Sequence, residues 1–202
     1  MSLKLIVTKL QLMNKKIITS EELKGYCKDL NQDYYATIRY LTYQNYVARI
    51  LKGIFYIRSL EERKLNKTDF SYLEIIRDAL KTKRVKHWYF GLETALKLNN
   101  MTHEYFSLDC VISDSIFRAR PITILGHKVK FTKLSPRLIS FGIKNNSLPY
   151  SNPEKTVLDL LYLGKYSKEE FLESSRKVSK RQLIRYSKNY DARVRATVSE
   201  LK

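Results

Sequence analysis

The sequence predicts an α+β protein, in which an N-terminal winged helix-turn-helix domain, residues 1–60, precedes a mixed α/β domain, residues 61–202. Two observations carry this prediction. Three stretches of helical periodicity followed by a hairpin occupy the N-terminal part, which is the element order of a winged helix-turn-helix. Strand-like and capped helical segments then alternate before a helical, basic tail, a mixture typical of an α+β domain.

Three helices are expected in the first domain. Apolar residues recur at helical spacing over residues 3–13. Thr19 and Glu22 stand at capping-box spacing, so they predict the start of a second helix. Asn31 is expected to cap a third helix that runs to about Gln44. The inner faces of the second and third helices are expected to carry Leu23, Tyr26, Cys27, Leu30, Tyr34, Ile38 and Leu41.

A hairpin follows the third helix. Asn45 is expected to end the helix in the left-handed conformation that Asn tolerates. The segments "YVARIL" and "IFYIRS" are rich in β-branched and aromatic residues and predict two short strands that join at Lys52 and Gly53. The charged segment "SLEERKLNKTD" then predicts a linker between the domains.

The second domain is predicted to combine a sheet with flanking helices. A helix is expected from about Phe70 to Leu80, and "WYFGLETALKLNN" predicts a strand that feeds a helix. Residues 105–143 are strand-like, with a turn at Gly126 and His127. "SNPEKTVLDLLYLG" predicts a helix that Asn152 caps and Gly164 ends. Two further helix starts have capping-box spacing, at Ser167 with Glu170 and at Ser179 with Gln182.

The charge favours a polyanionic partner. The chain has 38 Lys and Arg against 20 Asp and Glu, a formal net charge of +18, and each phosphate that a cation neutralises releases condensed counterions. The basic excess is densest at the two ends of the chain. The two cysteines, Cys27 and Cys110, stand far apart, which favours a reducing compartment. We therefore expect a cytoplasmic protein with no membrane-spanning segment, since no apolar run approaches 18 residues.

Candidate DNA-binding residues lie on the third helix and the hairpin. A recognition helix lies in the major groove, so its outer face needs small or hydrogen-bonding side chains. The hairpin would place cations beside the sugar-phosphate backbone. The predicted interface therefore comprises Gln32, Ala36, Arg39, Tyr40 and Tyr43 on the helix, with Arg49 and Lys52 on the wing. The alternative is a small winged-helix fold used for protein contact, whose tyrosine-rich face is simply solvated.

No pattern predicts an enzyme. The glycines are too scattered for a phosphate-binding loop, and a Gly-Ser pair followed by paired Asp, as a nucleotidyltransferase needs, does not occur. Asp109 and Asp114 could be imagined as metal ligands, but carboxylates are common near strand ends. His87, His103 and His127 are scattered, and Cys110 in an apolar strand is expected to be a small core residue. We therefore expect no catalytic residue, metal or cofactor.

The tail from Ser174 to Lys202 is strongly basic. On short helices such a charge set is usually a solvated face, and docking of an acidic protein or contact with flanking DNA are the functional alternatives. The residues concerned are Arg176, Lys177, Lys180, Arg181, Arg185, Lys188, Arg193 and Arg195.

Three stretches together resemble a known family. They are "ITSEELKGYCKDLNQDYYATIRYLTYQNYVARILKGIFYI", "WYFGLETAL" and "LPYSNPEKTVLDLLYL". Their order and spacing resemble the AbiEi-type antitoxins of type IV toxin–antitoxin systems and related free-standing regulators. The resemblance implies an N-terminal winged helix that binds operator DNA and represses its own operon. It also implies a C-terminal domain tied to antitoxin activity, with a nucleotidyltransferase toxin encoded nearby.

The sequence thus predicts a transcriptional repressor that occludes a promoter. Its candidate partners are double-stranded operator DNA upstream of its own gene, a nucleotidyltransferase toxin and a second copy of the chain on the DNA. The alternative is a protein-interaction module that neutralises a partner protein and binds DNA only non-specifically. The two differ in that only a repressor prefers its own operator over random duplex.

Overall fold

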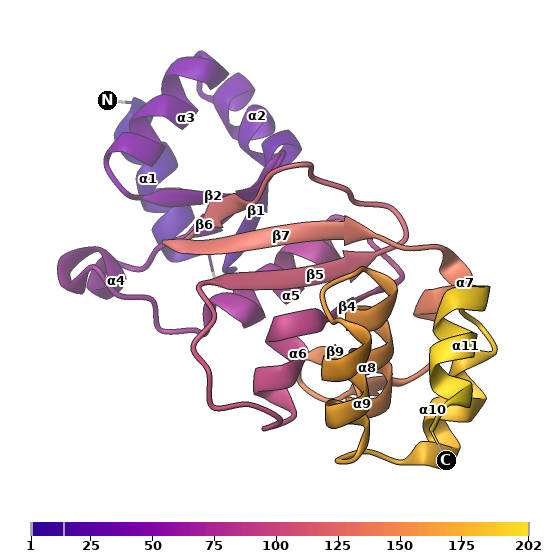
Figure 1. Cartoon of the computed structure of the whole chain (residues 1–202). Helices are drawn as coiled ribbons and strands as arrows, with labels where there is room; N and C mark the ends of the chain where they lie inside the picture. Colours follow the sequence, from indigo (N-terminus) through magenta and orange to yellow (C-terminus); the bar gives the residue numbers. More distant parts are fainter. Residues whose placement is uncertain (1, 14, 202) are drawn as a thin grey trace. The chain divides into compact units, whose positions relative to one another are not determined.

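The computed structural model describes residues 2–13 and 15–201, which divide into two compact units, Met1–Val85 and Lys86–Lys202 (Figure 1). Each unit combines helices with its own β-sheet, so the predicted α+β fold class is confirmed. No helix among these residues has the length and apolar character needed to cross a membrane.

The N-terminal unit has the helices and hairpin expected of a winged helix, in the expected order. The strands form an antiparallel sheet in the order β1-β3-β2. Strand β1 was not expected; it pairs with β3, with Ile17 opposite Tyr56. The elements are α1 (Ser2–Leu12), β1 (Ile17–Thr19), α2 (Ser20–Asp29), α3 (Tyr34–Tyr43), β2 (Val47–Leu51), β3 (Ile54–Ile57), α4 (Leu60–Leu65) and α5 (Tyr72–Thr82).

All seven predicted inner-face residues pack in the core of this unit, but only Leu23, Cys27 and Leu41 of them are fully buried. The other four are partly buried, and Thr37 takes a fully buried place on α3. The capping box of Thr19 and Glu22 is present at the start of α2. The buried core residues are Ile6, Leu10, Ile18, Leu23, Cys27, Leu41, Val47, Phe55 and Ile57.

The turn between α2 and α3 corrects one prediction. Asn31 does not cap α3; it has a left-handed φ of 50° and closes the C-terminus of α2, where its N–H donates to the Lys28 carbonyl. The Gln32 N–H donates to the Cys27 carbonyl at 2.7 Å, which completes a Schellman motif. Asp33 caps α3 instead, since its carboxylate accepts from the Ala36 N–H at 2.7 Å.

Asn45 ends α3 as predicted. Its φ is 56°, its N–H donates to the Thr42 carbonyl, and the Tyr46 N–H donates to the Leu41 carbonyl. This second Schellman motif turns the chain from α3 directly into β2.

The prediction that a linker between the domains follows residue 58 is wrong. Ser59 caps the short helix α4, and Glu62 is buried, where it accepts a 2.6 Å hydrogen bond from the Tyr56 hydroxyl of β3. Helix α5 contacts all three strands of the sheet. The first unit therefore extends through Val85, beyond the boundary expected at residue 60.

The C-terminal unit contains a mixed sheet in the order β6-β7-β5-β4-β9-β8. Strands β5 and β7 are parallel, as are β4 and β9, and the other neighbours are antiparallel. Its elements are β4 (Trp88–Phe90), α6 (Leu92–Leu98), β5 (Leu108–Ser113), β6 (Ile122–Ile124), β7 (His127–Lys133), α7 (Pro136–Ile139), β8 (Ile143–Asn145), β9 (Pro149–Ser151), α8 (Pro153–Tyr162), α9 (Lys168–Ser175), α10 (Lys180–Ser187) and α11 (Ala192–Ser199).

Two details of the strand-rich segment differ from expectation. The hairpin turn falls at Leu125 and Gly126, which both have positive φ, so His127 already belongs to β7. The segment "RLISFGI" is not one strand, because Pro136 at the first helical position starts α7 and only Ile143 returns to the sheet.

Helix α8 is central to this unit. It contacts α6 and β9 as well as α9, α10 and α11 (Figure 1). Asn152 caps it and Gly164, with a φ of 67°, ends it, as predicted. Val157, Leu158 and Leu161 pack in the main core. The predicted helix starts at Ser167 and Ser179 are also confirmed by side-chain caps.

Candidate nucleic-acid interface

A groove of about 770 Å³ lies between α3 and the β2–β3 hairpin of the N-terminal unit. Helix α3 and the hairpin provide most of its lining, and Ser20 and Lys24 of α2 provide the rest. The lining residues are Ser20, Lys24, Tyr34, Tyr35, Ile38, Arg39, Thr42, Tyr43, Arg49, Lys52, Gly53 and Phe55.

The groove is positively charged. Lys24, Arg39, Arg49 and Lys52 line it, and its lining includes no Asp or Glu. The structure forms no ion pair with any of these cations within the described part of the chain. Unneutralised cations around a concave surface focus a positive potential, which attracts anions.

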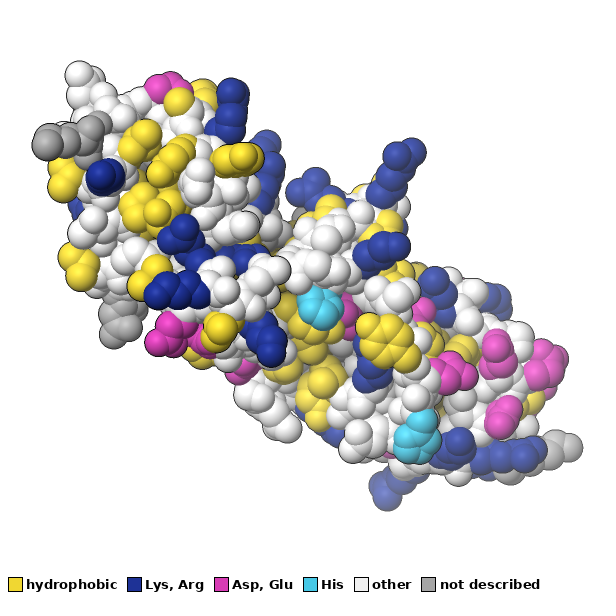
Figure 2. Space-filling model, turned by 90° about the vertical axis from the view of Figure 1, so that its left-hand side faces the viewer, with side chains coloured by type: hydrophobic (Ala, Val, Ile, Leu, Met, Phe, Trp, Pro, Cys, Tyr) yellow, Lys and Arg dark blue, Asp and Glu magenta, His cyan; other side chains and the backbone are white. Residues whose placement is uncertain are grey.

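Apolar and aromatic side chains form the rest of the groove. Ile38 of α3 and Phe55 of the hairpin contribute apolar surface. The Tyr35 ring packs edge-on against the Tyr34 ring, with centroids 5.2 Å apart, and remains 69% exposed. Burial raises the pKa of Tyr34 further above its ordinary value near 10, and its hydroxyl, protonated at neutral pH, can donate a hydrogen bond. On the face shown in Figure 2, hydrophobic side chains of this unit gather next to Lys and Arg side chains.

The structure brings four of the predicted residues together. Arg39 and Tyr43 line the groove from α3, and Arg49 and Lys52 line it from the hairpin. Tyr43 is 82% exposed, so its hydroxyl is open to an incoming ligand.

The other three predicted residues lie elsewhere. Gln32 precedes α3, and its side-chain amide donates to the carbonyls of Asn31 and Leu30 at 2.9 and 3.4 Å. Ala36 and Tyr40 are exposed on α3 but do not line the groove. Tyr40 stacks on Tyr46 with ring centroids 6.2 Å apart, so it braces the end of the helix.

Sequence reasoning missed Tyr35, Thr42 and Lys24 as groove residues. A signal was present, because Tyr35, Arg39 and Thr42 recur at spacings of four and three and so share a helix face. The predicted outer face was centred one residue too far along α3. Lys24 reaches the groove from α2, and only the tertiary arrangement of the two helices shows this.

The carboxylates considered as metal ligands have other partners. Asp109 is buried and accepts hydrogen bonds from Thr94 at 3.0 Å and Lys97 at 3.3 Å. Asp114 contacts the His87 ring at 2.7 Å. Within residues 2–13 and 15–201, no three His, Cys, Asp or Glu side chains are grouped to hold a metal ion.

Cys110 is a buried core residue. Its thiol donates to the Glu93 carboxylate at 3.2 Å, and burial raises its pKa far above the ordinary value. A thiol in this environment is not a nucleophile at neutral pH, because the thiolate is the reactive form.

The basic tail begins at the end of α9 and forms α10 and α11. Leu183, Tyr186, Val194 and Val198 of α10 and α11 pack into the main core of the unit. The tail cations lie on the opposite, exposed faces; Arg193 donates to the carbonyls of Leu161 and Tyr162 and Arg195 to that of Tyr190.

The fold and the groove define an α+β protein with a basic, concave surface beside an exposed helix. No protein-family model matches the sequence, and no curated protein matches it either. Among solved structures, the chain is similar to the RV2827C protein from Mycobacterium tuberculosis, with a TM-score of 0.61 and 12% sequence identity. The match covers 99% of this chain and 78% of that one, and at this identity it shows a shared fold alone.

Proposed function

We propose that this protein is a sequence-specific transcriptional repressor that binds double-stranded DNA through α3 and the β2–β3 hairpin. The observation that carries this proposal is the groove between them, whose lining has no carboxylate and has four cations that form no ion pair among the described residues. The order of helices and hairpin around it is that of a winged helix-turn-helix, a fold that places its third helix in the major groove.

Each part of the surface has a distinct role in this mechanism. With α3 in the major groove, the side chains of Arg39 and Thr42 can reach base edges, where Arg pairs best with guanine. Arg49 and Lys52 on the hairpin neutralise phosphates, which adds affinity but no sequence information. The bordering sugar-phosphate strand then occupies the groove, with its sugars against Ile38 and Phe55. Repression follows because the bound protein occludes the promoter.

The first test compares two duplexes of equal length, the sequence upstream of the protein's own gene and a scrambled version. Binding is measured by fluorescence anisotropy of the labelled duplexes across a salt titration. We expect a preference of at least about 10³ for the upstream sequence that survives moderate salt. Equal affinity for both duplexes that collapses with salt would overturn the repressor and favour a protein-interaction module with non-specific DNA binding.

The family resemblance of the sequence extends this proposal to toxin neutralisation. We propose that the chain also counteracts a nucleotidyltransferase toxin encoded beside it. The test is co-expression of that neighbouring gene with the wild-type chain or with Arg39→Ala. Growth rescued by both chains supports a neutralising role that is separate from DNA binding, and growth rescued by neither removes the antitoxin role.

A further inference from the structure

A segment with hydrogen bonds at both of its ends precedes β6 in the C-terminal unit. At its start, the Ser113 hydroxyl oxygen accepts hydrogen bonds from the N–H groups of Ser115 and Ile116 at 3.1 and 2.8 Å. Further along, the Arg118 N–H donates to the Phe131 carbonyl of β7 at 3.1 Å, and Lys130 donates to the Ala119 carbonyl. These bonds at both ends hold residues 114–120 along the edge of the sheet.

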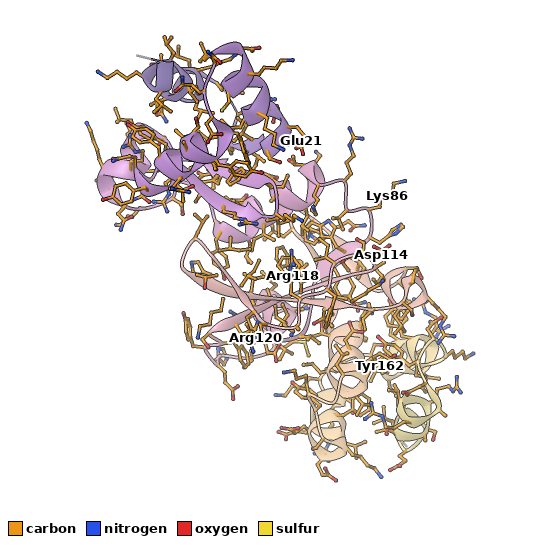
Figure 3. All side chains as sticks on the ribbon, turned by 90° about the horizontal axis from the view of Figure 1, so that it is seen from above. Glu21, Lys86, Asp114, Arg118, Arg120 and Tyr162 are labelled. Carbon is orange, nitrogen blue, oxygen red and sulfur yellow. The ribbon has the colours of Figure 1, made fainter. Side chains whose placement is uncertain are left out.

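This segment presents an aromatic ring among cations. Phe117 is 60% exposed although it lies in a well-bonded segment. The Lys130 ammonium lies 5.8 Å from the centre of its ring. Arg118 and Arg120 are exposed and follow directly in the chain, with Asp114 at the start of the segment (Figure 3).

The surrounding sequence contains no counter-charge. Between Asp114 and Glu154 no Asp or Glu occurs, and Asp114 itself is paired with His87. The described structure shows no ion pair for any Lys or Arg of this stretch. The basic residues are Arg118, Arg120, Lys128, Lys130, Lys133, Arg137 and Lys144.

A ligand that carries both phosphates and unpaired bases matches this combination of cations and an exposed aromatic ring. Cations along an extended segment can follow a phosphate backbone, and an exposed aromatic ring offers a platform on which a base stacks. In a duplex the bases are already stacked on each other, so the ring would have no base face to meet. An acidic protein surface would satisfy the cations but would give Phe117 no particular role.

We propose that Phe117, Arg118, Arg120, Lys128 and Lys130 form a second nucleic-acid surface, which binds single-stranded nucleic acid with a base stacked on Phe117. This inference goes beyond the proposed repressor function, because it concerns the other unit and a different form of nucleic acid. It does not depend on the groove between α3 and the hairpin.

The test uses the full chain and fluorescein-labelled strands of about 16 nucleotides and mixed sequence, as RNA and as DNA, with a DNA duplex of equal length. We expect Phe117→Ala to weaken single-strand binding by about 5- to 100-fold, as loss of one stacked base implies, and to leave duplex binding within about twofold. Phe117→Trp, which keeps a stacking ring, should restore the affinity. Comparing the two strands shows whether RNA or single-stranded DNA is preferred.

Tyr43→Ala is the matched control, because it removes an exposed aromatic ring from the groove of the other unit. It should weaken duplex binding and spare the single strands. The inference is overturned if Phe117→Ala leaves single-strand affinity unchanged, if it weakens both forms equally, or if wild-type protein binds no single strand. None of these results bears on the preference for the upstream duplex, so the repressor function stands or falls separately.

Discussion

Lys155 and Asp159 lie one turn apart on α8 and form an ion pair of 3.0 Å in which neither side chain has any exposed surface. The Asp159 carboxylate also accepts hydrogen bonds from the hydroxyls of Tyr190 at 2.6 Å and Tyr89 at 2.8 Å. The Lys155 ammonium lies 4.7 Å from the centre of the Phe141 ring. This network joins α8 to β4 and to the chain between α10 and α11, so it fastens the C-terminal helices to the sheet.

Removing one partner of this pair should destabilise the C-terminal unit severely. We expect Lys155→Ala to lower the free energy of unfolding by about 3–5 kcal/mol, because it leaves the Asp159 charge buried without its cation. The chain's one tryptophan, Trp88, lies on β4 in this unit, so its fluorescence in a urea titration reports the change. Lys180→Ala on the exposed surface of α10 is the control and should shift the same transition by at most about 0.5 kcal/mol. A cost for Lys155→Ala no larger than the control's would contradict this role.

The same network predicts a loss of stability at alkaline pH. Burial raises the pKa of both Tyr89 and Tyr190, and the nearby Asp159 charge adds to the effect. A tyrosine whose pKa is higher in the folded than in the unfolded protein stabilises the fold fully below the unfolded pKa near 10, and this stability is lost as the pH rises above it. Burial lowers the pKa of Lys155, so the titration of Lys155 changes the stability with pH in the opposite direction. A measurement that follows tyrosine ionisation alone does not include this contribution.

Tyrosinate absorbance measures whether the buried hydroxyls ionise while the protein is folded, which is the origin of the expected loss of stability. While far-UV circular dichroism stays native, Tyr89→Phe should leave the absorbance gained between pH 9 and pH 11 unchanged, because that hydroxyl does not ionise in the folded protein. A smaller gain for Tyr89→Phe than for the wild-type protein would show that the buried hydroxyl ionises in the folded state.

Two glycines of the N-terminal unit should respond in opposite directions to alanine. Gly53 in the hairpin turn has a φ of +76°, and an added Cβ would lie 2.9 Å from the Ser20 hydroxyl oxygen. Gly53→Ala should therefore destabilise the unit by about 1–2 kcal/mol. Gly25 lies inside α2, where a Cβ meets nothing within 4 Å, so Gly25→Ala should stabilise it by about 0.5–1 kcal/mol. Thermal unfolding followed by circular dichroism compares the pair, and shifts of the same sign would contradict the argument.

Arg39 and Lys52 should affect DNA binding in different ways. Arg39→Ala should cost about 1–3 kcal/mol and relax specificity at one base of the upstream site. Lys52→Ala should weaken binding to all sequences alike and reduce the slope of the salt dependence. Anisotropy titrations with single-base variants of the upstream duplex separate the two effects. Gln32→Ala is the matched control and should change the DNA affinity little, because the side-chain amide of Gln32 forms its hydrogen bond within the α2–α3 turn.

If Arg39→Ala and Lys52→Ala both bound the upstream duplex with wild-type affinity and base preference, α3 would not be the element that recognises the DNA sequence. A uniform loss for Arg39→Ala, without any change in base preference, would make it a phosphate contact instead.

Local signals in the sequence predicted much of the fold. The capping box of Thr19 and Glu22 and the left-handed conformation of Asn45 depend only on residues close in the chain. The local sequence pattern was therefore sufficient to predict both. Strand β1 is only three residues long and exists because β3 lies beside it. Helix α4 begins with a capping box of Ser59 and Glu62, a local signal like that at Thr19, and only the bond of Glu62 to Tyr56 lies beyond the local pattern.

The candidate site was harder to predict for a geometric reason. Successive residues of a helix differ by about 100° in direction, so a small error in placing its outer face exchanges one set of side chains for another. This is why Tyr35 was missed while Gln32, which precedes the helix, was included. Lys155 and Asp159 carry the spacing of an ordinary surface ion pair, and only the packing around α8 shows that both are buried.

The packing of α5 against β1, β2 and β3 has a practical consequence for dissecting the protein. A truncated protein that stops after the hairpin would lack α5 and its buried residues Ile76 and Leu80. It would expose apolar surface of the small sheet to water and aggregate. The shortest piece suited to isotope labelling and titration with DNA therefore ends at Val85.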